Sequence, residues 1–287
     1  MSENVSVPRK PDWLKIKLPA GVEYSEVKKN IKENRLHTIC ESGNCPNQTE
    51  CWGAGTATLM ILGNVCTRSC MFCNVATGKP ENVDIAEPFR VAESVKRMGL
   101  KHVVITSVDR DDLTDGGSKI WAATIRAIRR HCPGVTMETL IPDFQGKQEN
   151  LQHIIDVKPE VVSHNIETVK RLSREVRVQA RFERSIDVLK RLKDGGIERT
   201  KSGIMLGLGE TTEEIIEAMD DLRSASVDVL TIGQYLQPTK MHLPVKKYVT
   251  PQEFKELKDI GLAKGFSIVE SGPMVRSSYH AERHIKK

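Results

Sequence analysis

"ATLMILGNVCTRSCMFCN", residues 57–74, joins a short apolar run to three cysteines, Cys66, Cys70 and Cys73. The spacing i, i+4, i+7 also occurs on one face of a helix. A helix does not fit here, because helix-breaking or turn-forming residues flank the cysteines, at Gly63, Asn64, Asn74, Gly78 and Pro80. The stretch therefore predicts a buried strand followed by a loop that carries three closely spaced thiols.

The apolar run at 57–63 is the first of a series. Similar runs recur along the chain, with amphipathic segments between them. The further runs cover residues 102–108, 135–141, 161–166, 201–209 and 229–235, and the amphipathic segments include 88–99, 117–130, 181–194 and 211–225. Thr211 or Thr212, followed by Glu213 and Glu214, predicts a capped start for the last of these helices. Strand–helix alternation implies parallel strands joined by crossover helices.

We count six βα units and a short late strand at 267–272, fewer than the eight units of a closed barrel. The prediction is an α/β fold, an incomplete (β/α)6 barrel of the TIM type, or else a doubly wound sheet. In both folds ligands bind at the C-terminal ends of the strands. Polar residues occur at those ends, namely Thr106, Asp109, Glu138, Thr139, His164, Asn165, 207–210, Gln234 and Tyr235.

The chain is expected to have three parts. An N-terminal extension covers residues 1–55, and its cysteine-rich stretch 38–55 should be loop. The barrel core covers residues 56–240, and a C-terminal part covers residues 241–287.

The composition is that of an ordinary globular protein: of 287 residues, 39% are hydrophobic and 28% charged. No apolar run approaches the roughly 20 residues of a membrane span, and the first residues lack the features of a secretory or transit peptide. These features indicate a cytoplasmic protein. The net charge of +5 is too small to argue for nucleic acid. Six of the seven cysteines lie between Cys40 and Cys73, which indicates metal binding or redox chemistry and not a disulfide framework.

A second triad, Cys40, Cys45 and Cys51, lies upstream with C-x4-C-x5-C spacing. Structural zinc sites and iron–sulfur clusters usually take four protein ligands, and each triad offers three. The residues alone leave several interpretations of this second triad: a zinc site completed by His37, plain loop cysteines, or an auxiliary iron–sulfur cluster.

The C-x3-C-x2-C loop, with the aromatic Phe72 before its last cysteine, resembles the hallmark of the radical S-adenosylmethionine enzymes. With C-x4-C-x5-C ahead of it, the chain resembles the lipoyl synthase family in particular. Segments similar to that family extend over about residues 35–281 and include "TSVDRDDLTDGG", "ETLIPDF", "TKSGIMLGLGET", "LTIGQYLQPT", "HLPVKKYVTPQEF" and "GPMVRSSYHA".

The resemblance implies two [4Fe-4S] clusters. The C-x3-C-x2-C cysteines would bind a radical-generating cluster, whose open iron takes S-adenosylmethionine. The upstream triad would bind an auxiliary, sulfur-donating cluster, and its fourth ligand would come from the C-terminal "RSSY" motif: Ser278, with Ser277 as the alternative. A serine oxygen is a weak partner for iron beside three thiolates, which suits a cluster that gives up sulfur. The resemblance places Glu138, Asn165 and Arg177 near S-adenosylmethionine; the alternative for each is an ordinary salt bridge. Phe72 and Gly207 are further candidate contacts, and the glycine-rich stretch 203–210 either lets the backbone approach a ligand or is a simple turn into a capped helix.

The family's substrate is an octanoyl chain linked to a lysine of a carrier protein, of the lipoyl-domain or H-protein type. Sulfur enters at C6 and C8, carbons that acid–base chemistry cannot activate. A low-potential electron donor such as ferredoxin or flavodoxin would supply electrons. The stretch 170–201 carries eleven Lys and Arg residues. This stretch is either a solvated surface or the docking site of an acidic carrier.

One segment departs from the family. Where the family commonly has Arg-Pro-Gly-Ala-x-Tyr, this chain has "RVQARF" at 177–182, with Val178 and Gln179 in place of the proline and glycine. The loop is therefore expected to differ in shape. The main alternative function is that of another sulfur-inserting enzyme similar to biotin synthase, which would lack the upstream triad and "RSSY". Outside enzymes, the alternative is a non-catalytic iron–sulfur carrier or a zinc-binding scaffold.

Overall fold

The computed structural model describes residues 9–15 and 22–285. Its main sheet has eight strands in the order β1-β2-β5-β6-β7-β8-β9-β10. β1 is antiparallel to β2, and every other pair of neighbours is parallel. The strands are β1 His37–Thr38, β2 Thr58–Ile61, β5 His102–Ser107, β6 Thr136–Leu140, β7 Val161–Ser163, β8 Arg199–Leu206, β9 Val229–Gln234 and β10 Ile268–Gly272. A separate pair joins β3 Val65–Cys66 to β4 Ala76–Thr77.

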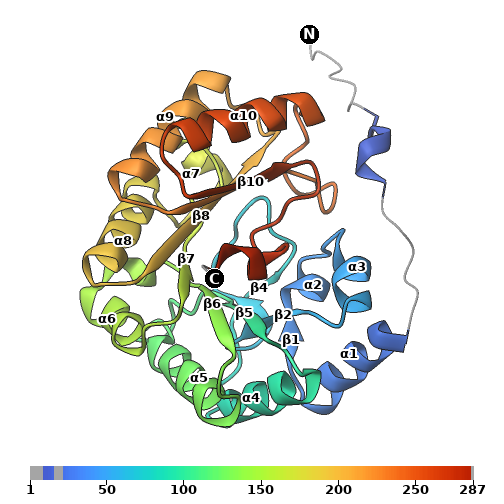
Figure 1. Ribbon diagram of the computed structural model, residues 1–287, viewed down its shortest axis with the longest axis vertical. Helices are drawn as coiled ribbons and strands as arrows, with labels where there is room; N and C mark the ends of the chain where they lie inside the picture. The colour runs from blue at the N-terminus through green and yellow to red at the C-terminus, as the bar shows by residue number, and fades with distance from the viewer. Residues whose placement is uncertain (1–8, 16–21, 286–287) are drawn as a thin grey trace.

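Helices follow most of the strands and lie outside the ring that the strands form (Figure 1). They are α1 Val22–Glu33, α2 Ile39–Ser42, α3 Gln48–Gly53, α4 Glu87–Met98, α5 Ser118–His131, α6 Gln148–Val157, α7 Ser173–Val176, α8 Phe182–Asp194, α9 Thr212–Ser224 and α10 Pro251–Ala263. Short 3-10 helices occur at Asp12–Leu14 (η1), Phe144–Gly146 (η2), Lys170–Leu172 (η3) and Ala281–His284 (η4).

The predicted α/β fold with an incomplete barrel is confirmed. All six predicted strands and the late strand are present, and the strand order has two ends, β1 and β10, which do not pair with each other in the described residues. Both end strands come from outside residues 56–240, so the two flanking parts complete the sheet that the core begins. The division into three parts itself stays a prediction.

One local prediction needs correction, and another is confirmed. The stretch 38–55 is not all loop, because it forms α2 and α3 around a turn at Cys45. Thr38 caps α2 by accepting a hydrogen bond from the Glu41 amide. The capped start of α9 is confirmed, since Thr211 and Glu214 form a reciprocal capping box.

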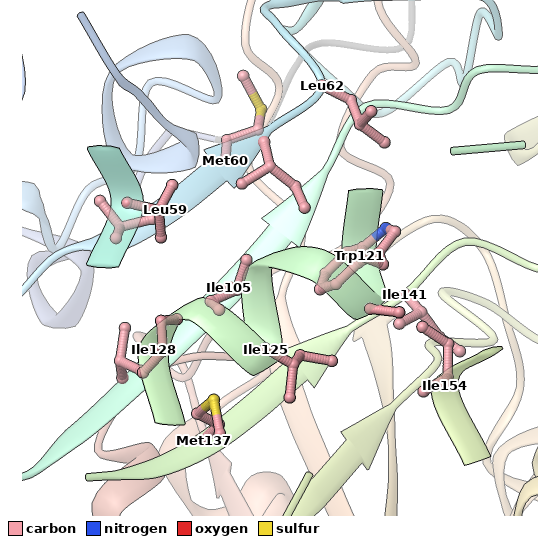
Figure 2. Close-up of a cluster of buried hydrophobic side chains, with 14 of the residues drawn as sticks. Leu59, Met60, Leu62, Ile105, Trp121, Ile125, Ile128, Met137, Ile141 and Ile154 are labelled. Atoms are coloured by element: carbon pink, nitrogen blue, oxygen red, sulfur yellow. The ribbon is translucent and has the colours of Figure 1, made fainter. Parts of the chain in front are cut away.

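The core lies between the sheet and its outer helices. Parallel strands that are buried on both faces have nearly continuous apolar sequences. β2 and β9 are such strands, since every one of their residues is buried. Figure 2 shows part of this core, with Trp121, Ile125 and Ile128 of α5 packed over β2, β5 and β6. In the described part of the chain, no helix has the length and apolar character of a membrane span.

Candidate active site

A cavity of about 660 Å³ opens at the C-terminal ends of the strands. Its wall combines the C-x3-C-x2-C loop, one residue of the upstream triad and the C-terminal "RSSY" motif. The chemically relevant lining residues are Cys45, Cys66, Cys70, Cys73, Asp109, His164, Asn165, Glu167, Arg177, Arg276, Ser277 and Ser278. Segments far apart in the sequence thus meet at one site, at the edge of the sheet where parallel-strand folds bind ligands.

The loop of residues 65–77, here the cluster loop, is held by a buried arginine. Arg68 donates two hydrogen bonds to Asp111, at 2.6 and 2.8 Å, and one to Asp143 at 2.7 Å. Its guanidinium also lies 3.3 Å from a carboxylate oxygen of Asp109. Burial alone would lower the pKa of Arg68, but the three acidic groups raise it overall. This bidentate pairing fixes the loop against the ends of β5 and β6.

The three thiols of the cluster loop are close neighbours. Burial raises the pKa of Cys66 to about 11 and that of Cys70 to about 12, and it also raises the pKa of Cys73. The charge of Asp109 and that of the neighbouring thiolates contribute further to the shifts at Cys66 and Cys70. Backbone amides of Arg68 and Asp109 donate to the Cys66 sulfur at 3.4 and 3.3 Å. Buried, mutually repelling thiolates of this kind are stabilised when they bind a metal cluster.

Two other segments contact the cluster loop. The divergent stretch 177–182 bonds to it through Gln179, whose side chain accepts from the Ser69 amide and donates to the Ser69 hydroxyl, both at 3.2 Å. The loop after β9 contributes His242, whose ring nitrogen lies 3.0 Å from the Cys73 carbonyl oxygen. The stretch 177–182, for which a different loop shape is predicted, therefore contacts the cluster loop directly.

The upstream motif, residues 40–51, gathers its cysteines by winding two short helices around a turn. Cys40 lies on α2, Cys51 lies on α3, and Cys45 between them donates its amide to the Cys40 carbonyl at 3.0 Å. Burial raises the pKa of Cys40 to about 11 and that of Cys51 to about 12. The proximity of the other thiols raises both values further, so the three cysteines form one group. Cys45 lines the cavity.

The C-terminal segment, residues 274–285, meets the upstream motif. Asn47 donates to the Met274 carbonyl at 2.7 Å, and the Tyr279 hydroxyl donates to Glu50 at 2.8 Å. Arg276 is close enough to Cys45 for that thiolate to raise the pKa of the arginine, against a larger lowering by burial. Residues 229 positions apart in sequence thus become neighbours.

The two serines of "RSSY" have different surroundings. The Ser277 hydroxyl exchanges hydrogen bonds with the Asn165 amide group, at 2.7 and 2.9 Å. The Ser278 hydroxyl makes no hydrogen bond with any described residue, and Ser278 lines the cavity. In the described chain, the hydroxyl oxygen of Ser278 is therefore without a hydrogen-bond partner, whereas that of Ser277 has one.

Three of the five residues expected near S-adenosylmethionine line the cavity: Phe72, Asn165 and Arg177. Arg177 is buried, and one of its terminal nitrogens donates to Ile166 O at 3.1 Å and Ser185 Oγ at 2.9 Å. Its positive charge lowers the pKa of Cys70, against a larger rise caused by burial.

The other two have different contacts. Glu138 does not line the cavity; it is fully buried and pairs with Lys201 at 2.7 Å. Gly207 has φ +102°, and a Cβ there would lie 2.4 Å from the Lys247 carbonyl oxygen. This glycine is required by the packing of the chain against itself. The predicted contacts of Glu138 and Gly207 with S-adenosylmethionine stay predictions without support from these positions.

Glu167 was not singled out from the sequence, although it lines the cavity. It lies past the end of β7 with a positive φ of 64°, and it accepts a hydrogen bond from Asn165 at 3.0 Å. Burial raises its pKa, although the charge of Arg177 opposes that effect. Its place two residues after Asn165 in a run of polar strand-end residues is the one sequence signal that could have identified it.

The basic stretch 170–201 is largely neutralised by acidic partners. Ion pairs join Lys170 to Glu183, Arg171 to Glu214, Arg184 to Asp143, Lys190 to Asp194, Arg191 to Asp187, Lys193 to Asp228 and Lys201 to Glu138. Arg174 and Arg181 are exposed and have no acidic partner in the described chain. The charge count along the sequence thus overstates the positive surface offered to a partner.

The donor set fits iron–sulfur clusters. All seven cysteines are free thiols, and thiolates are the ligands that such clusters take. In the described residues, no three His, Cys, Asp or Glu side chains lie close enough to share one metal ion. A cluster is bound through separate iron atoms, so its thiolates stand farther apart than the ligands of a single ion.

Solved structures similar in fold include methylornithine synthase, with a TM-score of 0.56 and 13% identity over 90% of this chain and 85% of that chain. Another is coproporphyrinogen III oxidase from Escherichia coli, a radical SAM enzyme, with a TM-score of 0.54 and 13% identity over 78% of this chain and 57% of that one. At this level of identity the likeness concerns the fold.

Sequence comparisons are more specific. The model of the Radical SAM superfamily matches residues 60–222, and that of the N-terminal domain of lipoyl synthase matches residues 1–45. The mitochondrial lipoyl synthase of Nematostella vectensis is 63% identical over 99% of both chains. The lipoyl synthase of Flavobacterium johnsoniae is 63% identical over 99% of this chain and 98% of its own. The chain therefore belongs to the lipoyl synthase family of radical S-adenosylmethionine enzymes.

Proposed function

We propose that the protein inserts two sulfur atoms at C6 and C8 of an octanoyl chain bound to a lysine of a carrier protein, with the sulfur drawn from an auxiliary cluster of its own. The observation that carries this proposal is the meeting of two three-cysteine motifs at one cavity, each one ligand short of four. Membership of the family supports the reaction type.

As a radical S-adenosylmethionine enzyme, the chain uses a [4Fe-4S] cluster and S-adenosylmethionine. In the proposal, Cys66, Cys70 and Cys73 bind that cluster. When bound, the cluster and S-adenosylmethionine supply a 5′-deoxyadenosyl radical, which removes hydrogen from carbons that bear no activating group. The protein's part is to hold the thiols through Arg68 and to bind the cofactor beside them. Arg177 is the proposed partner of the cofactor's carboxylate, with Phe72 and Asn165 as further contacts.

The second cluster is proposed at the upstream motif, bound by Cys40, Cys45, Cys51 and Ser278. Two features of the described residues support Ser278 over Ser277: its hydroxyl has no hydrogen-bond partner, whereas that of Ser277 is engaged by Asn165. An alkoxide oxygen is a harder ligand than a thiolate. The bond from iron to the serine oxygen is thus the weakest of the four proposed ligand bonds, as a cluster that donates sulfur requires.

The cavity has the size and polarity for an acyl chain. Its volume of about 660 Å³ lies within the usual range of small-molecule sites, roughly 300–1,000 Å³. Apolar side chains cover much of the wall, namely Ile39, Met60, Phe72, Val75, Val108, Leu140, Ile141, Ile204, Met205 and Leu236. An octanoyl chain in this space would pass between the proposed radical source and the proposed sulfur source.

The remaining partners are proposals from the family. The carrier would be of the lipoyl-domain or H-protein type, and ferredoxin or flavodoxin would be the electron donor. Arg174 and Arg181, beside and within the stretch 177–182 that contacts the cluster loop, are two exposed basic groups of the stretch 170–201 that remain available to an acidic partner. The cytoplasmic location stays a prediction.

Anaerobic incubation of the reconstituted protein with an octanoyl-lysine peptide, S-adenosylmethionine and a low-potential reductant tests the proposal. Mass spectrometry of the peptide should show the gain of two sulfur atoms, and the protein should start with about eight irons, four per cluster. A peptide that is recovered without sulfur while S-adenosylmethionine is cleaved would reject the proposed reaction.

A further inference from the structure

The C-terminal segment does not end at the cavity. After "RSSY" it enters the middle of the ring of strands, where η4 and the C-terminal end of the described chain lie (Figure 1). His284 on η4 is fully buried, and its carbonyl oxygen accepts a hydrogen bond from Arg199 at the start of β8. The segment is therefore held at two places, near the upstream motif and inside the sheet.

Lys201 of β8 holds the inner part of the C-terminal segment, residues 277–284. Its ammonium nitrogen lies 2.7 and 2.9 Å from the two carboxylate oxygens of Glu138 on β6, 2.5 Å from the Ser277 carbonyl oxygen and 3.1 Å from His284 Nδ1. An ammonium group has three hydrogens to donate. The carboxylate, the carbonyl and the imidazole use all three. One side chain thus joins the sheet to both ends of the stretch 277–284.

A buried ion pair of this kind is not explained by stability. Lys201 and Glu138 are both fully buried, and the loss of hydration makes such pairs no better for stability than apolar residues of the same size. One attested use of buried polar groups is to fix geometry. The carbonyl that Lys201 holds belongs to Ser277, and the next residue in the chain is Ser278.

We infer that Lys201, held by Glu138 and His284, is a positioning residue that sets where Ser278 stands against the upstream motif. This inference rests on the proposed function, in which Ser278 is a ligand of the auxiliary cluster. In this inference Glu138 supports the C-terminal segment through Lys201, which agrees with the absence of Glu138 from the cavity wall.

The variant that tests the inference is Lys201→Met with Glu138→Gln. Changing Lys201 alone would leave a buried carboxylate without its counter-charge and could unfold the chain, whereas the double change removes both charges at similar volume. Lys264→Met with Asp220→Asn is the control for the loss of an ion pair elsewhere, because it removes a partly exposed pair, 2.5 Å long, between the residue after α10 and α9.

The first measurement is hydrogen exchange by mass spectrometry on the anaerobically reconstituted protein. In the double variant, peptides that cover residues 277–285 should exchange at least about tenfold faster than in the parent, while peptides of β5 and β9 keep their rates. The control should match the parent. Unchanged exchange at 277–285, or equal acceleration in every strand, would overturn the inference.

The second measurement is the rate at which a chelator removes iron. The double variant should lose about four of about eight irons at least about tenfold faster, and adding Ser278→Ala should accelerate this loss no further, because both changes act on one ligand. Full additivity would overturn the inference. If Ser278→Ala alone leaves iron release unchanged, the ligand assignment in the proposed function fails, and the exchange data still report separately whether Lys201 holds the segment.

Discussion

The cluster loop and the upstream motif both present three cysteines near one cavity, yet they are held in different ways. The cluster loop is fixed by contacts from the strands beneath it, chiefly the bonds of Arg68 to Asp111 and Asp143. The upstream motif sits on two four- to six-residue helices and is closed from outside by the C-terminal segment. The first is part of the barrel, whereas the second is assembled from the two ends of the chain.

This difference matches the chemistry proposed for each. A cluster that must transfer electrons repeatedly needs a fixed set of ligands, and the barrel edge provides it. A cluster that is consumed must open and be rebuilt, and the upstream motif is closed by a separate segment and not by the strands of the barrel. Changes at the two motifs should therefore have separable effects.

Removal of one thiol from each motif should have the largest effect. Cys70→Ala should abolish both S-adenosylmethionine cleavage and sulfur insertion, because three thiols are already the minimum for the radical cluster. Cys45→Ala should abolish sulfur insertion but leave cleavage intact. Chromatography of 5′-deoxyadenosine together with mass spectrometry of the peptide measures both. Loss of cleavage in both variants to the same extent would show that the motifs do not act separately.

Arg68→Lys should have the next largest effect. A lysine keeps the charge but cannot form the bidentate bond to Asp111, so S-adenosylmethionine cleavage should fall by about 10- to 100-fold, as for lost supporting contacts at other metal sites. Arg110→Lys is the control, since Arg110 is equally buried but pairs with Asp112 away from the cavity wall. Equal losses in the two variants would mean that Arg68 serves general stability.

Ser278→Cys tests how the upstream motif holds its proposed cluster. A thiolate binds iron more strongly than a serine oxygen, so the auxiliary cluster should persist in the presence of a chelator while sulfur insertion slows by about tenfold or more. Cleavage of S-adenosylmethionine should be unaffected. Ser277→Cys is the matched variant and should not stabilise the cluster. Reversal of the two results would assign the ligand to Ser277.

Thr211→Ala should have the smallest effect and touch neither motif. It removes the cap of α9 and should cost about 1 kcal/mol of the free energy of unfolding, seen as a fall in Tm of about 2–4 °C. Hydrogen bonding to Arg171 and to the Thr211 amide lowers the pKa of Glu214 to about 2, so its stabilising contribution is present above its ordinary pKa and is lost as pH falls towards 2. Iron content should not change; a loss of iron would show that α9 supports a cluster.

Much of the fold could be predicted from the sequence. The seven parallel strands of the sheet follow from apolar runs such as 57–63 and 229–235, in which the strands β2 and β9 are buried at every residue. The helices at 39–42 and 48–53 could not, because they are too short for helical periodicity to register and depend on capping and tertiary contacts. The cysteines were identified from their spacing alone.

The surroundings of the cysteines could not be predicted in the same way. Which polar residues face a cavity depends on strand register and on long-range partners, and a single-residue shift reverses a side chain. Glu138, expected at the C-terminal end of its strand, is instead the middle residue of β6 and does not line the cavity, whereas Glu167, past the end of β7, does. The role proposed for Lys201 could not be predicted from the sequence either, because its partners are 63, 76 and 83 residues away along the chain.

In the proposed reaction one cluster drives the chemistry and the other is consumed as its sulfur source. The most direct test reconstitutes the protein with 34S-labelled sulfide and allows one turnover with an octanoyl-lysine peptide in unlabelled buffer. The product should carry two 34S atoms, and the sulfide content of the protein should fall from about eight to about four, as only the cluster at Cys66, Cys70 and Cys73 remains. A product with unlabelled sulfur, or a protein that retains all its labelled sulfide, would contradict the proposed reaction.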